Sequence, residues 1–265
     1  MKRVMLRVAY DGTDYCGWQL QPGVATIEGV LNQALSALLG EQITVTGASR
    51  TDSGVHSLGN VAVFDTDTRI PADKICYALN QRLPDDIVVQ SSAEVAPDFH
   101  PRHCDSTKTY EYRILNREFP LPTERRDSYF YYRRLDLARM REAAAYLVGT
   151  HDFASFCAAH SQAETTVRTV YDCQVEKQGD LICIRVTGAG FLYNMVRIIA
   201  GTLIEIGSGL KEPQQMPAIL DACARSAAGP TAPAHGLTMI GIEFAENPCI
   251  LGEKSKKAVD SGKSA

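Results

Sequence analysis

The sequence lacks several features that define large classes of protein. No apolar run approaches the roughly 18 residues that a membrane-spanning helix needs. The N-terminus, MKRVMLRVAY, alternates polar and apolar residues, so it does not resemble a signal peptide. Eight cysteines occur singly, without a Cys-x-x-Cys pair, so there is no local zinc signature. We therefore expect a cytoplasmic protein with free thiols, no metal site and no membrane partner.

A phosphate-binding loop is also missing, because GSGLK at residues 207–211 does not complete the pattern G-x-x-x-x-G-K-[ST]. This stretch is more typical of a helix end followed by a turn. His151 and Asp152 form a dipeptide found in metal phosphohydrolases, but no second His and Asp set at fitting spacing occurs. We therefore expect His151 to be an ordinary surface or core histidine.

The charge of the chain is uneven along its length. The formal net charge of the whole chain is -4, which taken alone argues against a nucleic-acid-binding protein. Residues 101–141 nevertheless hold more basic than acidic side chains, and Arg is suited to forked phosphate contacts. The basic side chains are Arg102, Lys108, Arg113, Arg117, Arg125, Arg126, Arg133, Arg134, Arg139 and Arg141. This cluster alone does not distinguish an RNA-docking surface from an ordinary salt-bridged surface.

The order of predicted elements repeats once along the chain. In the first half, strand-like segments are 4–10, 43–48, 60–66 and 87–95, and helical segments are 26–39 and 71–82. In the second half, the strands are 108–115, 167–175, 181–187 and 237–244, and the helices are 136–148, 191–206 and 213–225. Both halves thus have the β-α-β-β-α-β order of a ferredoxin-like unit.

We accordingly expect an α+β protein in which two ferredoxin-like halves join edge to edge into a continuous, mostly antiparallel sheet flanked by helices. The predicted domains are residues 1–103 and residues 104–249. The polar tail at residues 250–265 has the composition of a disordered segment.

Three short motifs carry candidate chemistry. GASRTDSGVH, at residues 47–56, holds Asp52, for which the simpler interpretation is a turn residue before Gly54. GAGFLYNMVRIIAGTL, at residues 188–203, carries Arg197 among apolar residues, where a charge needs a partner such as Asp52 or must reach the helix surface. TKTYEYRI, at residues 107–114, places Lys108, Tyr110 and Tyr112 on one strand face.

These motifs, with YDGTDYCGWQLQP near the start and HGLTMIGIEF near the end, resemble those of the bacterial tRNA pseudouridine synthase A family in the same order. The resemblance runs from about residue 4 to residue 244. The usual family run is GAGRTDAGVH, so Ser49 and Ser53 are departures that leave the Arg-Thr-Asp core intact.

The resemblance implies the pseudouridine synthase fold and isomerisation of uridine at positions 38, 39 and 40 of the tRNA anticodon stem-loop, by a homodimer without a cofactor. It implies that Asp52 is the essential carboxylate, that Arg197 pairs with it through a forked bond, and that Tyr110 stacks on the base. It further implies substrate contacts from Arg50, Thr51, His56 and Lys108. The candidate contacts to the RNA backbone are Arg102, Arg113, Arg125, Arg126, Arg133 and Arg134.

Two other functions remain open from the residues themselves. One is an Asp-dependent nucleoside hydrolase, which would normally need a second carboxylate or a metal cluster. The other is a non-catalytic RNA-binding module on the same double fold, favoured by the basic segment with interleaved aromatic residues.

Overall fold

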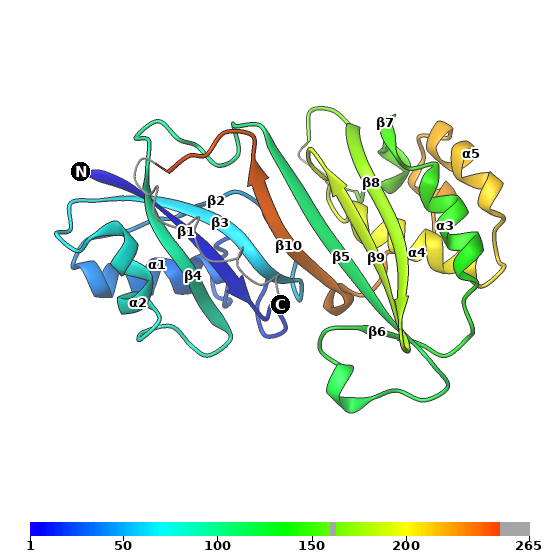
Figure 1. Ribbon diagram of the computed structural model, residues 1–265, viewed down its shortest axis with the longest axis horizontal. Helices are drawn as coiled ribbons and strands as arrows, with labels where there is room; N and C mark the ends of the chain where they lie inside the picture. Colours follow the sequence, from blue (N-terminus) through cyan, green and yellow to red (C-terminus); the bar gives the residue numbers. More distant parts are fainter. Residues whose placement is uncertain (160–162, 250–265) are drawn as a thin grey trace, which may run out of the picture.

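The computed structural model of the protein describes residues 1–159 and 163–249 (Figure 1). The strands are β1 Lys2–Tyr10, β2 Thr46–Gly47, β3 His56–Thr66, β4 Ile87–Val95, β5 Ser106–Asn116, β6 Tyr129–Tyr131, β7 Gly149–Asp152, β8 Val167–Gln178, β9 Leu181–Gly188 and β10 Leu237–Phe244. The α-helices are α1 Ile27–Leu39, α2 Ile75–Leu79, α3 Leu137–Ala145, α4 Met195–Gly207 and α5 Met216–Asp221. The tail expected to be disordered, residues 250–265, lies outside the described residues.

One continuous sheet joins both halves of the chain. Its strand order is β4-β1-β3-β10-β5-β9-β8-β7, with β2 paired to β3 and β6 paired to β5. The orders β4-β1-β3-β2 and β10-β5-β9-β8 are each that of a ferredoxin-like unit, and the two units meet where β10 runs parallel to β3. Most of the other pairings are antiparallel. The predicted fold class, including the edge-to-edge junction, is confirmed.

The register of the strands directs one face of the sheet toward the helices. In the N-terminal half, Val4 lies opposite Phe64 and both side chains are buried in the same core. In the C-terminal half, Tyr112 lies opposite Ile184 in the second core. Helix α2 contacts β4, α3 contacts β8 and α4 contacts β5. Helices α1 and α2 therefore cover the strands of one half, and α3, α4 and α5 accompany the other (Figure 1).

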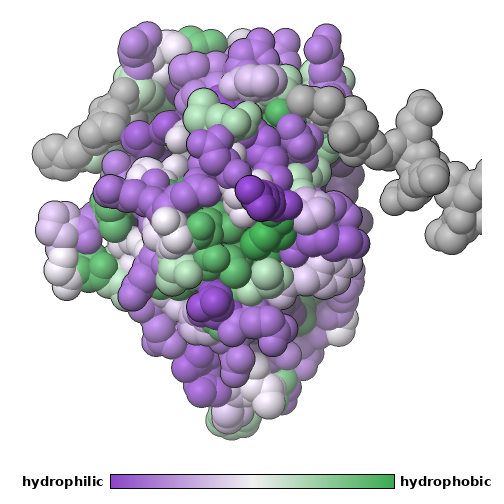
Figure 2. Space-filling model, turned by 90° about the vertical axis from the view of Figure 1, so that its left-hand side faces the viewer, coloured by the Kyte–Doolittle hydropathy of each residue, from purple (hydrophilic) through white to green (hydrophobic). Residues whose placement is uncertain are grey.

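Two apolar cores lie beneath this sheet. The N-terminal core packs α1 and α2 on β1, β3 and β4, and the surface at this end is mostly hydrophilic around a small apolar patch (Figure 2). The C-terminal core also takes in Ala48, Val55 and Val61 from the first half. Residues on both sides of the Asp52 loop are thus packed into the second core. The division into domains near residue 103 stays a prediction.

The structure differs from the expected elements in a few places. The strand expected at 43–48 is reduced to β2, because the amide of Ile43 donates to the Ser36 hydroxyl and that of Val45 donates to the Asn32 side chain. These bonds attach the segment to α1 instead of extending its pairing with β3. The helix expected from residue 191 begins at Met195.

Each of the helices expected at 71–82 and 213–225 is instead a 3₁₀ turn followed by a short α-helix. The turns are η1 Ala72–Lys74 and η4 Pro213–Gln215, and they precede α2 and α5. Strands β6 and β7 were not expected, since each is too short to give an alternating pattern in the sequence.

Candidate active site

Asp52 lies in the loop between β2 and β3, where a tight turn presents its side chain. The amide of Val55 donates to the Asp52 carbonyl at 3.1 Å, and Gly54 supplies the positive φ of 77° that this turn requires. The carboxylate of Asp52 contacts the guanidinium of Arg197. The loop is therefore a turn, as the simpler interpretation held, but its carboxylate contacts a second element of the fold.

Buried hydrogen bonds hold this loop in place from the N-terminal core. The Trp18 amide donates to the Thr51 carbonyl at 3.0 Å, and the Thr51 hydroxyl lies 2.8 Å from the hydroxyl of Tyr10. The side-chain amide of Asn60, which is fully buried, donates to the Ser49 carbonyl at 3.0 Å. Because both residues before and after Arg50 are anchored, the backbone position of Asp52 is closely defined.

Arg197 approaches Asp52 from the first turn of α4. Its Nη1 donates to Asp52 Oδ2 at 3.3 Å and to Asn194 Oδ1 at 2.7 Å. Its Nε donates to the carbonyl of Ala232 at 2.8 Å. The prediction of a forked bond is wrong. One guanidinium nitrogen contacts one carboxylate oxygen, and the guanidinium also donates to the Asn194 side chain and the Ala232 carbonyl.

Two opposing effects act on the Asp52 carboxyl. Burial raises its pKa above the ordinary value, and the charge and hydrogen bond of Arg197 lower it again. Both side chains are mostly shielded, with relative exposures of 23% for Asp52 and 17% for Arg197. The result is a carboxyl group that is more readily protonated than a surface aspartate, next to a fixed positive charge.

Tyr110 and Lys108 enter the same region from β5. Tyr110 is buried, packs edge-on against Phe191 at 5.2 Å between ring centroids, and its burial raises the pKa of its hydroxyl to about 12. Lys108 donates from Nζ to the carbonyl of Ala48 at 3.2 Å, and burial lowers the pKa of its amine. The Tyr110 phenol is thus protonated at neutral pH, where it is able to donate a hydrogen bond.

A cavity of about 920 Å³ opens in front of these residues, between the two halves of the chain. Six sequence-predicted residues line it: Arg50, Thr51, Asp52, Arg102, Lys108 and Tyr110. Arg197 is not among the residues that line the cavity, and it contacts the lining residue Asp52 through that carboxylate. The Thr51 hydroxyl bonds to Tyr10, which makes this side chain part of the loop anchor.

The cavity also has lining residues that sequence reasoning did not single out as site residues. They are Cys16, Gln19, Gln21, Ser49, Phe191, Leu192, Tyr193 and Asn194, among others. All eight lie inside the motifs quoted in the sequence analysis, and membership of those motifs was the available signal. Of the two departures from the usual family run, Ser49 is buried and interacts with the Tyr110 hydroxyl, whereas the Ser53 hydroxyl donates to the carbonyl of Tyr15.

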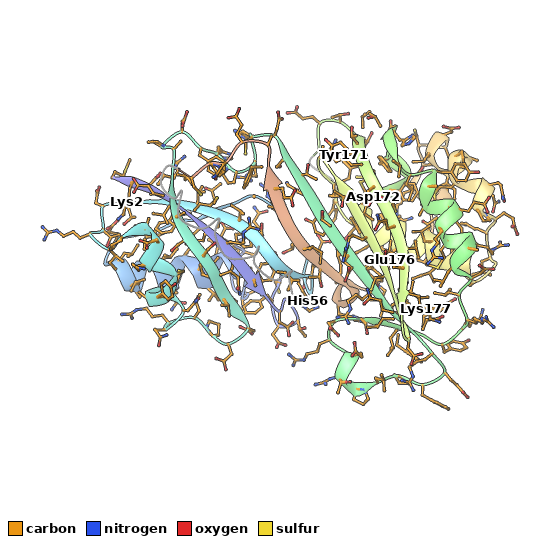
Figure 3. The ribbon with its side chains drawn as sticks, viewed as in Figure 1. Lys2, His56, Tyr171, Asp172, Glu176 and Lys177 are labelled. Atoms are coloured by element: carbon orange, nitrogen blue, oxygen red, sulfur yellow. The ribbon has the colours of Figure 1, made fainter. Side chains whose placement is uncertain are left out.

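His56 is not brought to this cavity. It lies at the start of β3 beside β10, as Figure 3 shows, and lines a separate hollow of about 420 Å³. Its Nδ1 accepts from the amide of Gly12 at 3.1 Å, and its Nε2 lies 3.1 Å from the carbonyl of His235. Both ring nitrogens therefore contact the protein backbone, and His56 is not among the residues that line the cavity in front of Asp52.

The arginines of residues 101–141 divide into two groups. Some are held by the protein: Arg113 pairs with Asp127 and Glu124, Arg139 donates to the carbonyls of Ile206 and Lys211, and Arg141 donates to that of Val175. Arg102, Arg125, Arg126, Arg133 and Arg134 are exposed; Arg141 is exposed as well, but its Nε is bonded to the backbone of β8. Arg113, which the sequence suggested as an RNA contact, instead fixes the segment before β6.

Within the described residues, no group of three or more His, Cys, Asp or Glu side chains is arranged to hold a metal ion. His151 and Asp152 lie on β7, where Asp152 accepts from the amide of Ala154 at 2.9 Å. In the same part of the chain, every helix is too short or too polar to cross a membrane.

Comparison with known proteins gives a consistent result. A family model described as tRNA pseudouridine synthase matches residues 7–103 and 143–245. A protein named tRNA pseudouridine synthase A from Thermoanaerobacter sp. (strain X514) is 48% identical over 244 residues, covering 92% of this chain and 100% of the relative. A protein of the same name from Brevibacillus brevis is 49% identical over 246 residues, with the same coverage of both chains. The chain belongs to the tRNA pseudouridine synthase family, a family of isomerases.

Proposed function

We propose that this protein converts uridine to pseudouridine at positions 38, 39 and 40 of the tRNA anticodon stem-loop, with Asp52 as the essential carboxylate. The observation that carries the proposal is the position of that carboxylate. It faces a large cavity, with Tyr110 beside it and the positive charge of Arg197 behind it. Membership of the family supplies the reaction class, and the geometry supports these residues as the reacting centre.

The reaction is balanced without a co-reactant. The bond from N1 of the uracil to C1′ of the ribose breaks, and a bond from C5 to C1′ forms. C5 loses its proton and N1 gains one, so uridine and pseudouridine are isomers. Cleavage of a glycosidic bond develops positive character on the sugar, and a carboxylate is the usual protein group that stabilises or traps it. Asp52 is the carboxylate of this cavity that lies next to Tyr110 and Lys108.

Tyr110 is proposed to stack on the uracil and to assist removal of the C5 proton. Base–aromatic stacking contributes about 1–3 kcal/mol per base. A flipped nucleotide leaves a gap in the RNA stem, and Arg50, which is exposed beside the cavity, is proposed to fill it. Lys108 lies on the cavity wall close to Tyr110, and we assign it to the bound nucleotide.

We further propose that tRNA docks on the exposed arginines, that the working enzyme is a homodimer in the cytoplasm, and that it needs no cofactor. Arg102 connects this docking surface to the cavity, since it is exposed and also lines the cavity wall. The other candidates, from Arg125 to Arg134, lie on the segment around β6 that extends beyond the end of the sheet (Figure 1). Phosphate contacts of this kind make affinity depend on salt.

The test is incubation of the protein with an unmodified tRNA transcript and no added cofactor. Pseudouridine is then mapped by carbodiimide-dependent primer-extension stops. Stops at positions 38 to 40 with wild-type protein, and none with Asp52→Ala that still binds tRNA, are expected. Release of free uracil would indicate the nucleoside hydrolase, and binding without any chemical change would indicate the RNA-binding module. Either result would overturn the proposal.

A further inference from the structure

Asn194, on the wall of the cavity, has an unusual backbone conformation. Its φ is 60° and its ψ is 9°, in the left-handed region. Among the described residues that are not glycine, only Asn194 and Cys223 have a positive φ. Asn enters this region more readily than most residues, but the conformation is still disfavoured and persists only where neighbouring structure requires it.

The side chain of Asn194 is not used in the way its position predicts. Asn194 is the N-cap residue of α4, and an N-cap asparagine normally accepts a hydrogen bond from a backbone amide of the first helical turn. Here the side chain makes no capping bond. Its Oδ1 accepts from Arg197 Nη1 at 2.7 Å, a shorter contact than the 3.3 Å between that nitrogen and Asp52.

Arg197 is thereby held at two points besides Asp52. The Ala232 carbonyl accepts from Nε at 2.8 Å, and Asn194 accepts from Nη1. An arginine side chain has many rotamers, so one contact alone would leave its charged end able to move. Together the two acceptors fix the planar guanidinium with one Nη1 hydrogen left to face the carboxylate.

We propose that Asn194 is a positioning residue for the reaction, which holds the guanidinium of Arg197 against the Asp52 carboxylate from the wall of the cavity. This inference rests on the proposed function, in which Asp52 reacts as the carboxylate. Asn194 acts through Arg197 and needs no contact with the substrate. Its left-handed backbone is required because it places the residue at the helix start while the side chain turns toward Arg197 instead of the helix amides.

Two phenols and an imidazole around the pair are neutral at neutral pH, and Lys108 on the same cavity wall is held by the carbonyl of Ala48. Burial raises the pKa of Tyr110, which lies near Asp52, and of Tyr112, which lies near Arg197. Burial lowers the pKa of His235, which also lies near Arg197. A change in the titration of Asp52 caused by a substitution at residue 194 therefore reports on Arg197.

The experiment compares Asn194→Gly, Asn194→Asp and the control Cys223→Gly. Glycine permits the same backbone but removes the acceptor, so we expect kcat on its pH plateau to fall about tenfold or more, with tRNA affinity unchanged within about twofold. Aspartate keeps an oxygen acceptor and tolerates the left-handed region, so its plateau should stay within about threefold of wild type. Cys223→Gly relaxes another positive-φ position, one that does not line the cavity, and should match wild type.

Two further measurements separate positioning from a general loss of structure. In an Arg197→Met background, adding Asn194→Gly should change kcat less than about twofold, because the residue acts through the missing guanidinium. In the free protein, NMR titration of the Asp52 carboxyl should show a higher pKa in Asn194→Gly than in wild type.

The inference is overturned if Asn194→Asp loses as much activity as Asn194→Gly, if the loss persists in Arg197→Met, or if the NMR titration of Asp52 is unchanged. The titration needs no tRNA, so it tests the positioning independently of the reaction. Full turnover by Asp52→Asn would instead overturn the proposed function while the titration result stood.

Discussion

Asp52 and Arg197 contact each other across 145 positions of the chain, with Nη1 of the arginine 3.3 Å from Oδ2 of the aspartate. Asp52 belongs to the loop before β3 in the first half, and Arg197 belongs to α4 in the second. The pair therefore forms only when β10 has paired with β3 and the halves are joined. Because the contact is single and partly shielded, its strength depends on how each partner is held by its own half.

Replacing Arg197 with methionine should shift the pH dependence of activity. Burial alone then acts on Asp52, so the pKa of its carboxyl rises and a smaller fraction is ionised at low pH. We expect the acid limb of kcat/KM to move to higher pH, with a loss of at least about tenfold on the alkaline plateau and a larger loss at acid pH. Arg185→Met, which removes a surface pair with Glu111, is the control and should leave the limb in place. An unshifted limb in Arg197→Met would contradict the assigned role.

Asp52→Asn should abolish turnover and also make the protein more stable at neutral pH. The folded carboxyl has a pKa raised above its ordinary value of 3.8, so the native state binds more protons than the unfolded state between the two pKa values. Stability therefore falls as pH rises through that window, and the cost is fully present at pH 7. We expect a gain of about 0.5–2 kcal/mol in the free energy of unfolding at pH 7, shrinking toward pH 4.

Urea unfolding at a series of pH values measures this difference, and single-turnover assays follow the activity. A variant less stable than wild type at pH 7 would mean that the attraction to Arg197 outweighs the burial of the carboxylate. Asp73→Asn, at an exposed ion pair with Lys74, is the matched control and should change neither quantity appreciably.

Tyr110→Phe should separate binding from turnover. The ring remains able to stack on the base and to pack on Phe191, so the Kd for tRNA is expected to stay within about threefold of wild type. The hydroxyl is lost, and we expect kcat to fall about 10²-fold, the scale of one proton-transfer group. Filter binding and release of tritium from C5-labelled tRNA give the two quantities. Equal losses in both would indicate that the tyrosine only binds.

The exposed arginines and the structurally held ones should respond differently to removal. The paired variants Arg125→Gln/Arg126→Gln and Arg133→Gln/Arg134→Gln should weaken tRNA binding and reduce the slope of log Kd against log salt by about 1 for each phosphate that is no longer bound. The nearby acids Asp11 and Asp14, at 3.5 and 3.7 Å from Arg126, are exposed enough to release it.

The control pair for this experiment is Arg139→Gln/Arg141→Gln. These side chains donate to backbone carbonyls of α4 and β8, so their loss should lower stability while the salt slope stays unchanged. A salt slope that is the same in all three double variants would remove the segment around β6 from the docking surface.

The sequence predicted the regular elements where local pattern and packing agree. The strands at 87–95 and 237–244 have the expected bounds, and α1 ends before Gly40, whose φ of 69° stops the helix. The expected strand at 43–48 is mostly absent because Asn32 and Ser36 of α1 accept hydrogen bonds from its amides. The spacing of apolar residues in the sequence does not reveal such side-chain bonds.

Part of the candidate site could also be predicted from the sequence, and part could not. An isolated Arg197 in an apolar helix indicates a buried partner, and the carboxylate of Asp52 supplies it. The Ala232 carbonyl, which lies 35 residues further along and also holds Arg197, gives no signal in the sequence, because every residue has a carbonyl. The position of His56 also needed the fold, since the strand that starts there points it to the hollow away from Asp52.

Gly201 provides a test of how the segment behind Arg197 is held. A Cβ at this position of α4 would lie 1.8 Å from the carbonyl oxygen of Pro230, which is backbone and has to move. The same segment supplies the Ala232 carbonyl to Arg197 Nε, so Gly201→Ala should displace an anchor of the arginine as well as overpack the core. We expect a loss of about 1–3 kcal/mol in the free energy of unfolding together with reduced kcat.

Gly190→Ala is the matched control, because a Cβ there meets nothing within 4 Å although Gly190 lies close to the cavity in sequence. It should stay within about 0.5 kcal/mol of wild type, as substitutions without a buried contact do. Urea unfolding measures the stability of both variants, and single-turnover kinetics measure their rates. If Gly201→Ala unfolds more easily but turns over at the wild-type rate, the Ala232 contact is dispensable, and the orientation of Arg197 then depends on Asn194 alone.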